Sequence, residues 1–92
     1  VYLRSGFAGR LRQYVRNSIC RGWIIEFYMD FNELTTLDGA LMGLNSLRIL
    51  GLTHNKLERI LPEDFIGLEK LEILELSHNK LLTLREMQTV SL

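Results

Sequence analysis

Two histidines come closest, by residue type and spacing, to a site that could do chemistry. His54 lies in "LGLTHNKL" (residues 50–57) and His78 in "LELSHNKL" (residues 74–81), 24 residues apart, and each is followed by Asn and Lys. On adjacent units of a repeat, two imidazoles would offer two nitrogen ligands to one metal ion. Zinc sites take three or four protein ligands, and only Glu75 is near in register. We therefore expect no metal and no cofactor, and interpret both histidines as solvated or packed residues.

Catalysis is not expected either. No nucleophile, base and orienting group recur at a workable spacing, and no glycine-rich phosphate loop is present. If the imidazoles of His54 and His78 face each other, protonation below about pH 6.5 would add repulsion between like charges. Mild acid sensitivity is therefore a hypothesis for this pair.

The two histidine segments belong to a repeat that organises most of the chain. One series comprises Leu47, Leu50, Leu52, Asn55, Leu57, Ile60, Phe65 and Leu68. Its first six positions recur 24 residues later as Leu71, Leu74, Leu76, Asn79, Leu81 and Leu84. A looser copy lies 23 residues earlier and lacks one residue in its return segment: Ile24, Phe27, Met29, Asn32, Leu34, Leu37, Met42 and Leu44. A period of this length indicates stacked structural units.

The pattern LxxLxLxxNxLxxIxxxxFxxL resembles the leucine-rich repeat family, in particular its 24-residue type, common in animal extracellular proteins. The resemblance covers residues 23–92 as rungs 23–46, 47–70 and a truncated 71–92. It implies an α/β repeat fold, a solenoid with short parallel strands on the concave side and loops or short helical turns on the convex side, cut from a larger protein. Independently, the alternation of leucines predicts one half-buried strand per rung. Pro62 predicts a turn or short helix on the return side, with Phe65 and Leu68 pointing inward.

Three asparagines, Asn32, Asn55 and Asn79, recur where each predicted strand turns away. A carboxamide can donate hydrogen bonds to, and accept them from, main-chain groups that would otherwise be buried unpaired. We interpret these residues as a structural asparagine ladder. No Asn in the chain is followed by x-Ser or x-Thr, so the sequence has no acceptor for N-glycosylation.

The variable strand positions predict a concave face that binds a protein ligand. Its candidate residues are Glu26, Tyr28, Asp30, Arg48, Ile49, Thr53, His54, Glu72, Ile73, Glu75 and His78. The isoleucines would lie side by side, aromatic Tyr28 and Phe31 would lie at one end, and acids would surround them, as protein interfaces favour. In the alternative interpretation, Phe31 packs under a neighbouring segment and the acids only solvate the sheet.

Residues 1–22 differ from the rest of the chain in charge, which predicts a boundary near residue 22. They contain five arginines and no acid, a local charge of +5, whereas the other 6 basic and 11 acidic residues give −5. Phe7, Leu11, Tyr14 and Val15 have helical spacing, which predicts a basic amphipathic helix. This segment is interpreted as a cap on the first rung, as a membrane-surface or targeting segment, or as a flank of another part of the protein. Cys20 is the only cysteine, so no internal disulfide can form.

At the other end, "REMQTVSL" (residues 85–92) places Thr89 where Phe65 is expected and Leu92 where Leu68 is expected. We therefore expect an uncapped third rung, whose open edge accepts further repeats or self-association.

These features favour a protein-binding module from a receptor, adhesion or matrix ectodomain, located outside the cell or at its surface. The alternative is a structural or regulatory spacer that contacts partners through the basic helix. An intracellular location is compatible with this alternative. Nucleic-acid binding is not expected, because the sheet is acidic. A membrane span is not expected either, because no stretch approaches about 20 apolar residues.

Overall fold

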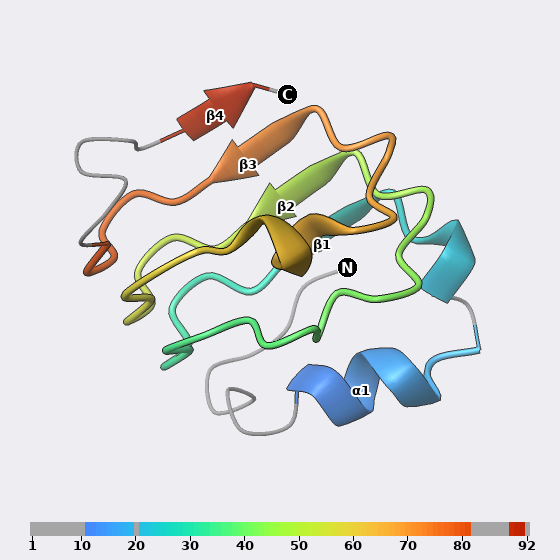
Figure 1. The fold of residues 1–92 in the computed structure, drawn as a ribbon, viewed down its shortest axis with the longest axis horizontal. Helices are drawn as coiled ribbons and strands as arrows, with labels where there is room; N and C mark the ends of the chain where they lie inside the picture. Colours follow the sequence, from blue (N-terminus) through green and yellow to red (C-terminus); the bar gives the residue numbers. More distant parts are fainter. Residues whose placement is uncertain (1–10, 20, 82–88, 92) are drawn as a thin grey trace.

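The computed structural model describes residues 11–19, 21–81 and 89–91. Within these residues the chain winds as stacked rungs, with the strands gathered in one sheet and the turns on the return side (Figure 1). The elements in chain order are α1 (Leu11–Asn17), η2 (Arg21–Trp23), β1 (Glu26–Tyr28), β2 (Ile49–Gly51), η3 (Pro62–Phe65), β3 (Ile73–Glu75) and β4 (Thr89–Ser91). The predicted α/β repeat with short parallel strands is confirmed.

The register of the parallel strands follows the sequence repeat. Phe27 of β1 pairs with Leu50 of β2, which pairs with Leu74 of β3. These three side chains are at most 4% exposed, so they form one apolar ladder through the core. Side chains of a strand alternate between its two faces, and the strand residues on either side of each ladder position therefore point to the open face. Met29, Leu52 and Leu76 form a second buried ladder at the turn that follows each strand.

On the return side of the second rung, η3 begins at Pro62 as predicted. Proline suits this first turn because its φ is already fixed at a helical value, and because the main-chain N–H that proline lacks has no acceptor within the turn at this position. The amide of Leu61 donates to Oδ2 of Asp64 at 2.9 Å, which ties the turn together. Leu68 is buried, and Phe65 is partly buried against the core. Both side chains thus close the core from the return side.

The alignment of the first rung needs one correction. Met42 was expected to point inward like Phe65, but its side chain is 74% exposed, whereas neighbouring Leu41 is 1% exposed. Leu41 lies 24 residues before Phe65, so the missing residue falls between Leu37 and Leu41. Buried Leu41 excludes Met42 from the core because successive residues in this turn point in different directions.

The third rung also differs from expectation. Residues 89–91 do not continue a return segment; they form β4, which pairs antiparallel to β3, with Leu74 opposite Val90. The expectation that the third rung leaves the edge of β3 open is therefore wrong. A further parallel strand of the repeat would lie 24 residues after β3. An antiparallel strand needs only a short connection, so β4 can pair with β3 sooner in the sequence than a further rung could. Leu84 lies outside the described residues.

At the opposite end of the coil from β4, α1 packs against the first rung (Figure 1). Leu11 and Val15 are buried in the same apolar core as the repeats, and the ring of Tyr14 lies 6.1 Å from that of Phe27 between centroids. The predicted helix is thus present over seven residues. Phe7 lies outside the described residues, and a domain boundary near residue 22 stays a prediction.

Candidate functional site

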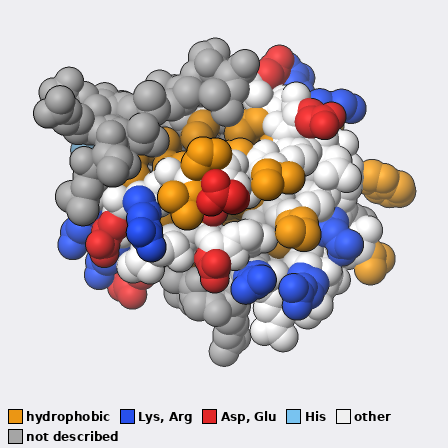
Figure 2. Space-filling view, viewed as in Figure 1, with side chains coloured by type: hydrophobic (Ala, Val, Ile, Leu, Met, Phe, Trp, Pro, Cys, Tyr) orange, Lys and Arg blue, Asp and Glu red, His pale blue; other side chains and the backbone are white. Residues whose placement is uncertain are grey.

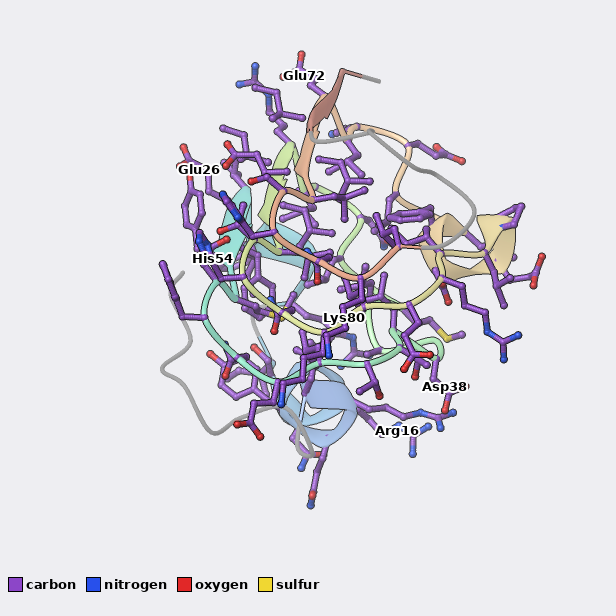
Figure 3. The ribbon with its side chains drawn as sticks, turned by 90° about the vertical axis from the view of Figure 1, so that its left-hand side faces the viewer. Arg16, Glu26, Asp38, His54, Glu72 and Lys80 are labelled. Carbon is purple, nitrogen blue, oxygen red and sulfur yellow. The ribbon has the colours of Figure 1, made fainter. Side chains whose placement is uncertain are left out.

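The open face of the sheet carries the predicted concave-face residues in columns that run across the rungs. Glu26, Ile49 and Ile73 pair in register in one column, and Tyr28, Gly51 and Glu75 pair in the next. Ile49 and Ile73 are half-buried neighbours. Glu26 and His54 project from the same side of the molecule, away from Arg16 and Asp38 (Figure 3). The sheet thus brings side chains that are distant in sequence onto one surface.

Tyr28 is held in place on this face by its neighbours. Its hydroxyl donates to Oε1 of Glu26 at 2.6 Å. Its ring lies over Gly51, because a Cβ at that glycine would approach Cδ1 of Tyr28 to 2.8 Å. Gly51 therefore leaves room for the aromatic ring, and Tyr28 is a rigid, half-buried aromatic group of the kind that anchors interfaces.

Two polar pairs join adjacent rungs at the borders of the face. Oδ1 of Asp30 accepts hydrogen bonds from the amide and the hydroxyl of Thr53, both at 2.7 Å. Nε of Arg48 donates to Oε2 of Glu72 at 2.7 Å. The second pair is more than half exposed, so it contributes less than about 1 kcal/mol to stability. An apolar strip of Ile49 and Ile73 thus lies between polar groups that are already paired.

An aromatic column runs along the end of the strands. The ring of Phe31 stacks on that of His54, and His54 stacks on His78, both at 4.2 Å between centroids. All three residues have left-handed backbone, with φ of 60°, 55° and 60°. The interpretation that Phe31 packs under a neighbouring segment is wrong, because its side chain is 64% exposed.

Sequence reasoning placed the two histidines together but missed Phe31 as the third member of the column. The signal was available, since Phe31 precedes Asn32 as His54 precedes Asn55. Parallel rings at this distance direct their nitrogen lone pairs along the ring planes and not toward each other. The stack is therefore better suited to packing than to sharing a metal ion.

The asparagines lie directly behind this column and bind the main chain. Nδ2 of Asn55 donates to the carbonyls of Met29 and Leu52 at 3.0 and 3.1 Å, and its Oδ1 accepts from the amide of Leu34 at 3.1 Å. Asn79 repeats the arrangement one rung later, with Nδ2 2.8 Å from the carbonyl oxygen of Leu52. Each of these side chains therefore ties its own rung to the preceding one.

Other kinds of site find little support in the part of the chain that the structure describes. There, no three His, Cys, Asp or Glu side chains lie close enough together to hold a metal ion. In the same residues, no helix has the length and apolar character needed to cross a membrane.

Comparison with known proteins supports the family suggested by the repeat. A family model described as leucine rich repeat matches residues 26–81, which is more than half of the chain. The chain belongs to the leucine-rich repeat family. The match begins at β1 and ends at Leu81, so α1 and β4 lie outside it. No curated protein and no solved structure matches the chain. Leucine-rich repeat domains are generally protein-interaction modules and typically non-catalytic scaffolds.

Proposed function

We propose that this leucine-rich repeat chain binds a protein ligand through the concave face of its sheet. The observation that carries the proposal is the register of β1, β2 and β3, which aligns Ile49 and Ile73 as an apolar strip beside the fixed ring of Tyr28. Interfaces favour such aromatic and aliphatic anchors within a polar rim. The polar rim here is the Asp30–Thr53 pair and the ion pair of Arg48 with Glu72.

The proposal extends to the class of parent protein. The period of the second and third rungs resembles the 24-residue type of animal extracellular proteins. We therefore propose a receptor, adhesion or matrix ectodomain, at the cell surface or outside the cell, as the source of the chain. A partner would be a protein with an exposed apolar group that fits between the polar borders of the face.

The test compares one chemical change on two sides of the coil. Ile73→Asp places a charge in the apolar strip, and Ile66→Asp places the same charge on the return side, where Ile66 is 71% exposed. These two variants and Tyr28→Ala are immobilised beside the wild type and used to capture proteins from a cell-surface extract. We expect Ile73→Asp and Tyr28→Ala to lose a captured protein that wild type and Ile66→Asp retain, while circular dichroism shows that all four are folded.

Capture that survives Ile73→Asp and Tyr28→Ala but disappears with Arg16→Gln would contradict the concave-face proposal. That outcome would favour the alternative, a spacer that contacts its partner through the basic helix α1.

A further inference from the structure

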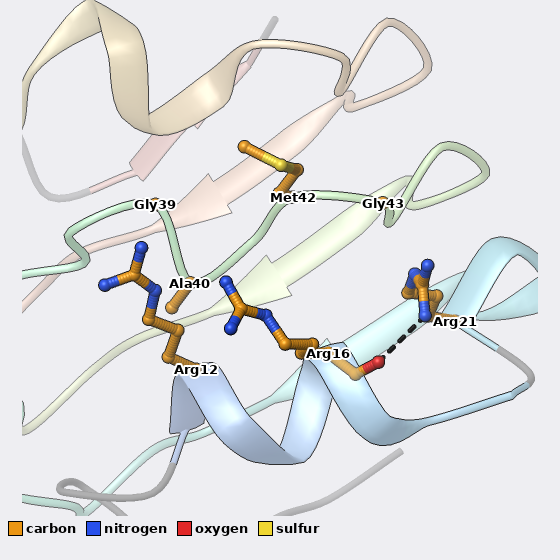
Figure 4. Close-up of a pocket in the computed structure, with 7 residues that line it drawn as sticks. All are labelled: Arg12, Arg16, Arg21, Gly39, Ala40, Met42 and Gly43. Atoms are coloured by element: carbon orange, nitrogen blue, oxygen red, sulfur yellow. Dashed lines mark hydrogen bonds between the residues drawn. The ribbon is translucent and has the colours of Figure 1, made fainter.

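Three arginines line one pocket at the N-terminal end of the coil. Arg12 and Arg16 lie one turn apart on α1, and Arg21 follows the helix. Their side chains lie in a row on one side of the pocket, and loop 39–43 of the first rung lines its other side (Figure 4). The pocket has a volume of about 160 Å³. A water molecule occupies about 30 Å³ in the liquid, so the pocket has room for a small polyatomic ion.

Arg21 is the most firmly positioned of the three. Its Nη1 donates to the carbonyl of Arg16 at 2.9 Å and to that of Ser18 at 3.4 Å. Its side chain also packs across Gly43, where an added Cβ would lie 2.6 Å from Nε. These contacts fix the guanidinium plane before any ligand arrives. A guanidinium carries five N–H donors, and the two bonds use only Nη1.

The charges around the pocket do not balance within the described residues. Arg12 lies 3.7 Å from Oδ2 of Asp38, and both side chains are largely exposed. No acidic side chain of the described residues forms an ion pair with Arg16 or Arg21. Three positive charges and one negative charge leave a local excess of +2. A divalent anion would neutralise this excess, whereas a single carboxylate would neutralise half of it.

The figures place this pocket away from the concave face. Arg16 and Asp38 lie on the side of the molecule opposite Glu26 (Figure 3). Exposed basic and apolar side chains also intermingle on the return side (Figure 2), but only at this pocket do three arginines line one cavity among the pockets described. A ligand here would therefore bind independently of a protein on the sheet.

We propose that the pocket of Arg12, Arg16 and Arg21 binds a phosphate or sulfate group. Arginine suits this chemistry because its planar fork donates two parallel hydrogen bonds to neighbouring oxygens of a tetrahedral oxyanion. Arg21, fixed by the carbonyls behind it, supplies the oriented fork. Arg16 supplies the second positive charge. Arg12, at the border of the pocket, is partly neutralised by its ion pair with Asp38.

The test uses inorganic phosphate and inorganic sulfate as probes. Each is titrated into the isotope-labelled chain at ionic strength held constant with sodium chloride, and amide chemical shifts are followed. We expect saturating shifts at Ala40 and Gly43. Arg16→Gln is expected to weaken the affinity at least tenfold, and Arg16→Lys to recover part of it, because charge returns without the fork. Arg59→Gln, an exposed arginine on the second rung, should stay within twofold of wild type.

Further arms of the same experiment distinguish the source of the group. Methyl phosphate, a sulfated disaccharide and phosphatidylcholine vesicles containing phosphatidic acid are compared with the free ions. Saturable binding of either soluble ester with the same dependence on Arg16 supports the proposal and names the ester class. Shifts that rise linearly without saturation, or equal affinities of wild type and Arg16→Gln for phosphate and sulfate, would overturn it. Binding to vesicles without saturable binding of either soluble ion would overturn it as well.

Discussion

The imidazole rings of His54 and His78 stack nearly in parallel, with 4.2 Å between centroids and 15° between planes. This contact joins the second and third rungs at the end of their strands. Phe31 extends it to the first rung, which makes an aromatic column across all three. The stack helps to hold backbone that costs about 1 kcal/mol or more per residue in the left-handed region.

The facing rings of His54 and His78 meet the geometric condition of the acid-sensitivity hypothesis, which stays a prediction. The melting temperatures of wild type and His78→Ala, each measured at pH 7.5 and pH 5.5, test it. Equal drops in both proteins would contradict this prediction.

Removal of Asn55 is expected to destabilise the fold strongly. Its buried carboxamide bonds main-chain groups of two rungs. Asn55→Ala leaves the Leu34 amide without this acceptor, whereas the Met29 carbonyl still accepts from Nδ2 of Asn32 at 2.9 Å. A buried group left unpaired costs about 1–3 kcal/mol, so we expect the free energy of unfolding to fall by about 1–3 kcal/mol. Urea denaturation measures the change. Exposed Asn45→Ala serves as the control and should stay within about 0.5 kcal/mol of wild type.

The corrected alignment of the first rung can be tested at two adjacent residues. Leu41→Ala removes a side chain that is 1% exposed and should cost about 2–5 kcal/mol of stability. Met42→Ala removes one that is 74% exposed and should change stability by less than about 0.5 kcal/mol. Thermal and urea unfolding of both variants decide the matter. A larger loss for Met42→Ala would restore the alignment based on the sequence alone.

Two glycines of the same loop separate backbone strain from steric contact. Gly39 and Gly43 have φ of +72° and +95°, so an alanine at either position costs about 1–2 kcal/mol. Only at Gly43 does an added Cβ also meet a side chain, that of Arg21. We therefore expect Gly43→Ala to be the more destabilising of the two in urea unfolding. Equal losses would show that Arg21 moves aside without cost.

Much of this fold was predictable because the core positions are periodic. The spacing of Phe27, Leu50 and Leu74 predicts both the strands and their register. These apolar side chains all face the core only when they pair with one another across the rungs. The choice between Leu41 and Met42 was not predictable from periodicity, because both side chains are apolar and either alignment requires a single deletion. Only packing against the neighbouring rung distinguishes them.

Non-local pairing and side-chain geometry set the other limits. The antiparallel direction of β4 depends on its contact with β3, and the repeat in the sequence does not predict it. The variable strand positions placed Tyr28 and Asp30 on the concave face, but the bonds to Glu26 and Thr53 depend on rotamers. The arginine pocket was not predictable, because it depends on how loop 39–43 lies relative to α1. The spacing of residues within 1–22 carries no information about that arrangement.

The pairing of β4 with β3 has a consequence for how such a coil can grow. β4 occupies the main-chain edge on which a further parallel rung would have to stack. Extension of the solenoid beyond the third rung and docking of β4 are therefore mutually exclusive. Residues 89–91 therefore compete with a further rung for the edge of β3. They would have to leave that edge before another parallel strand could pair with it.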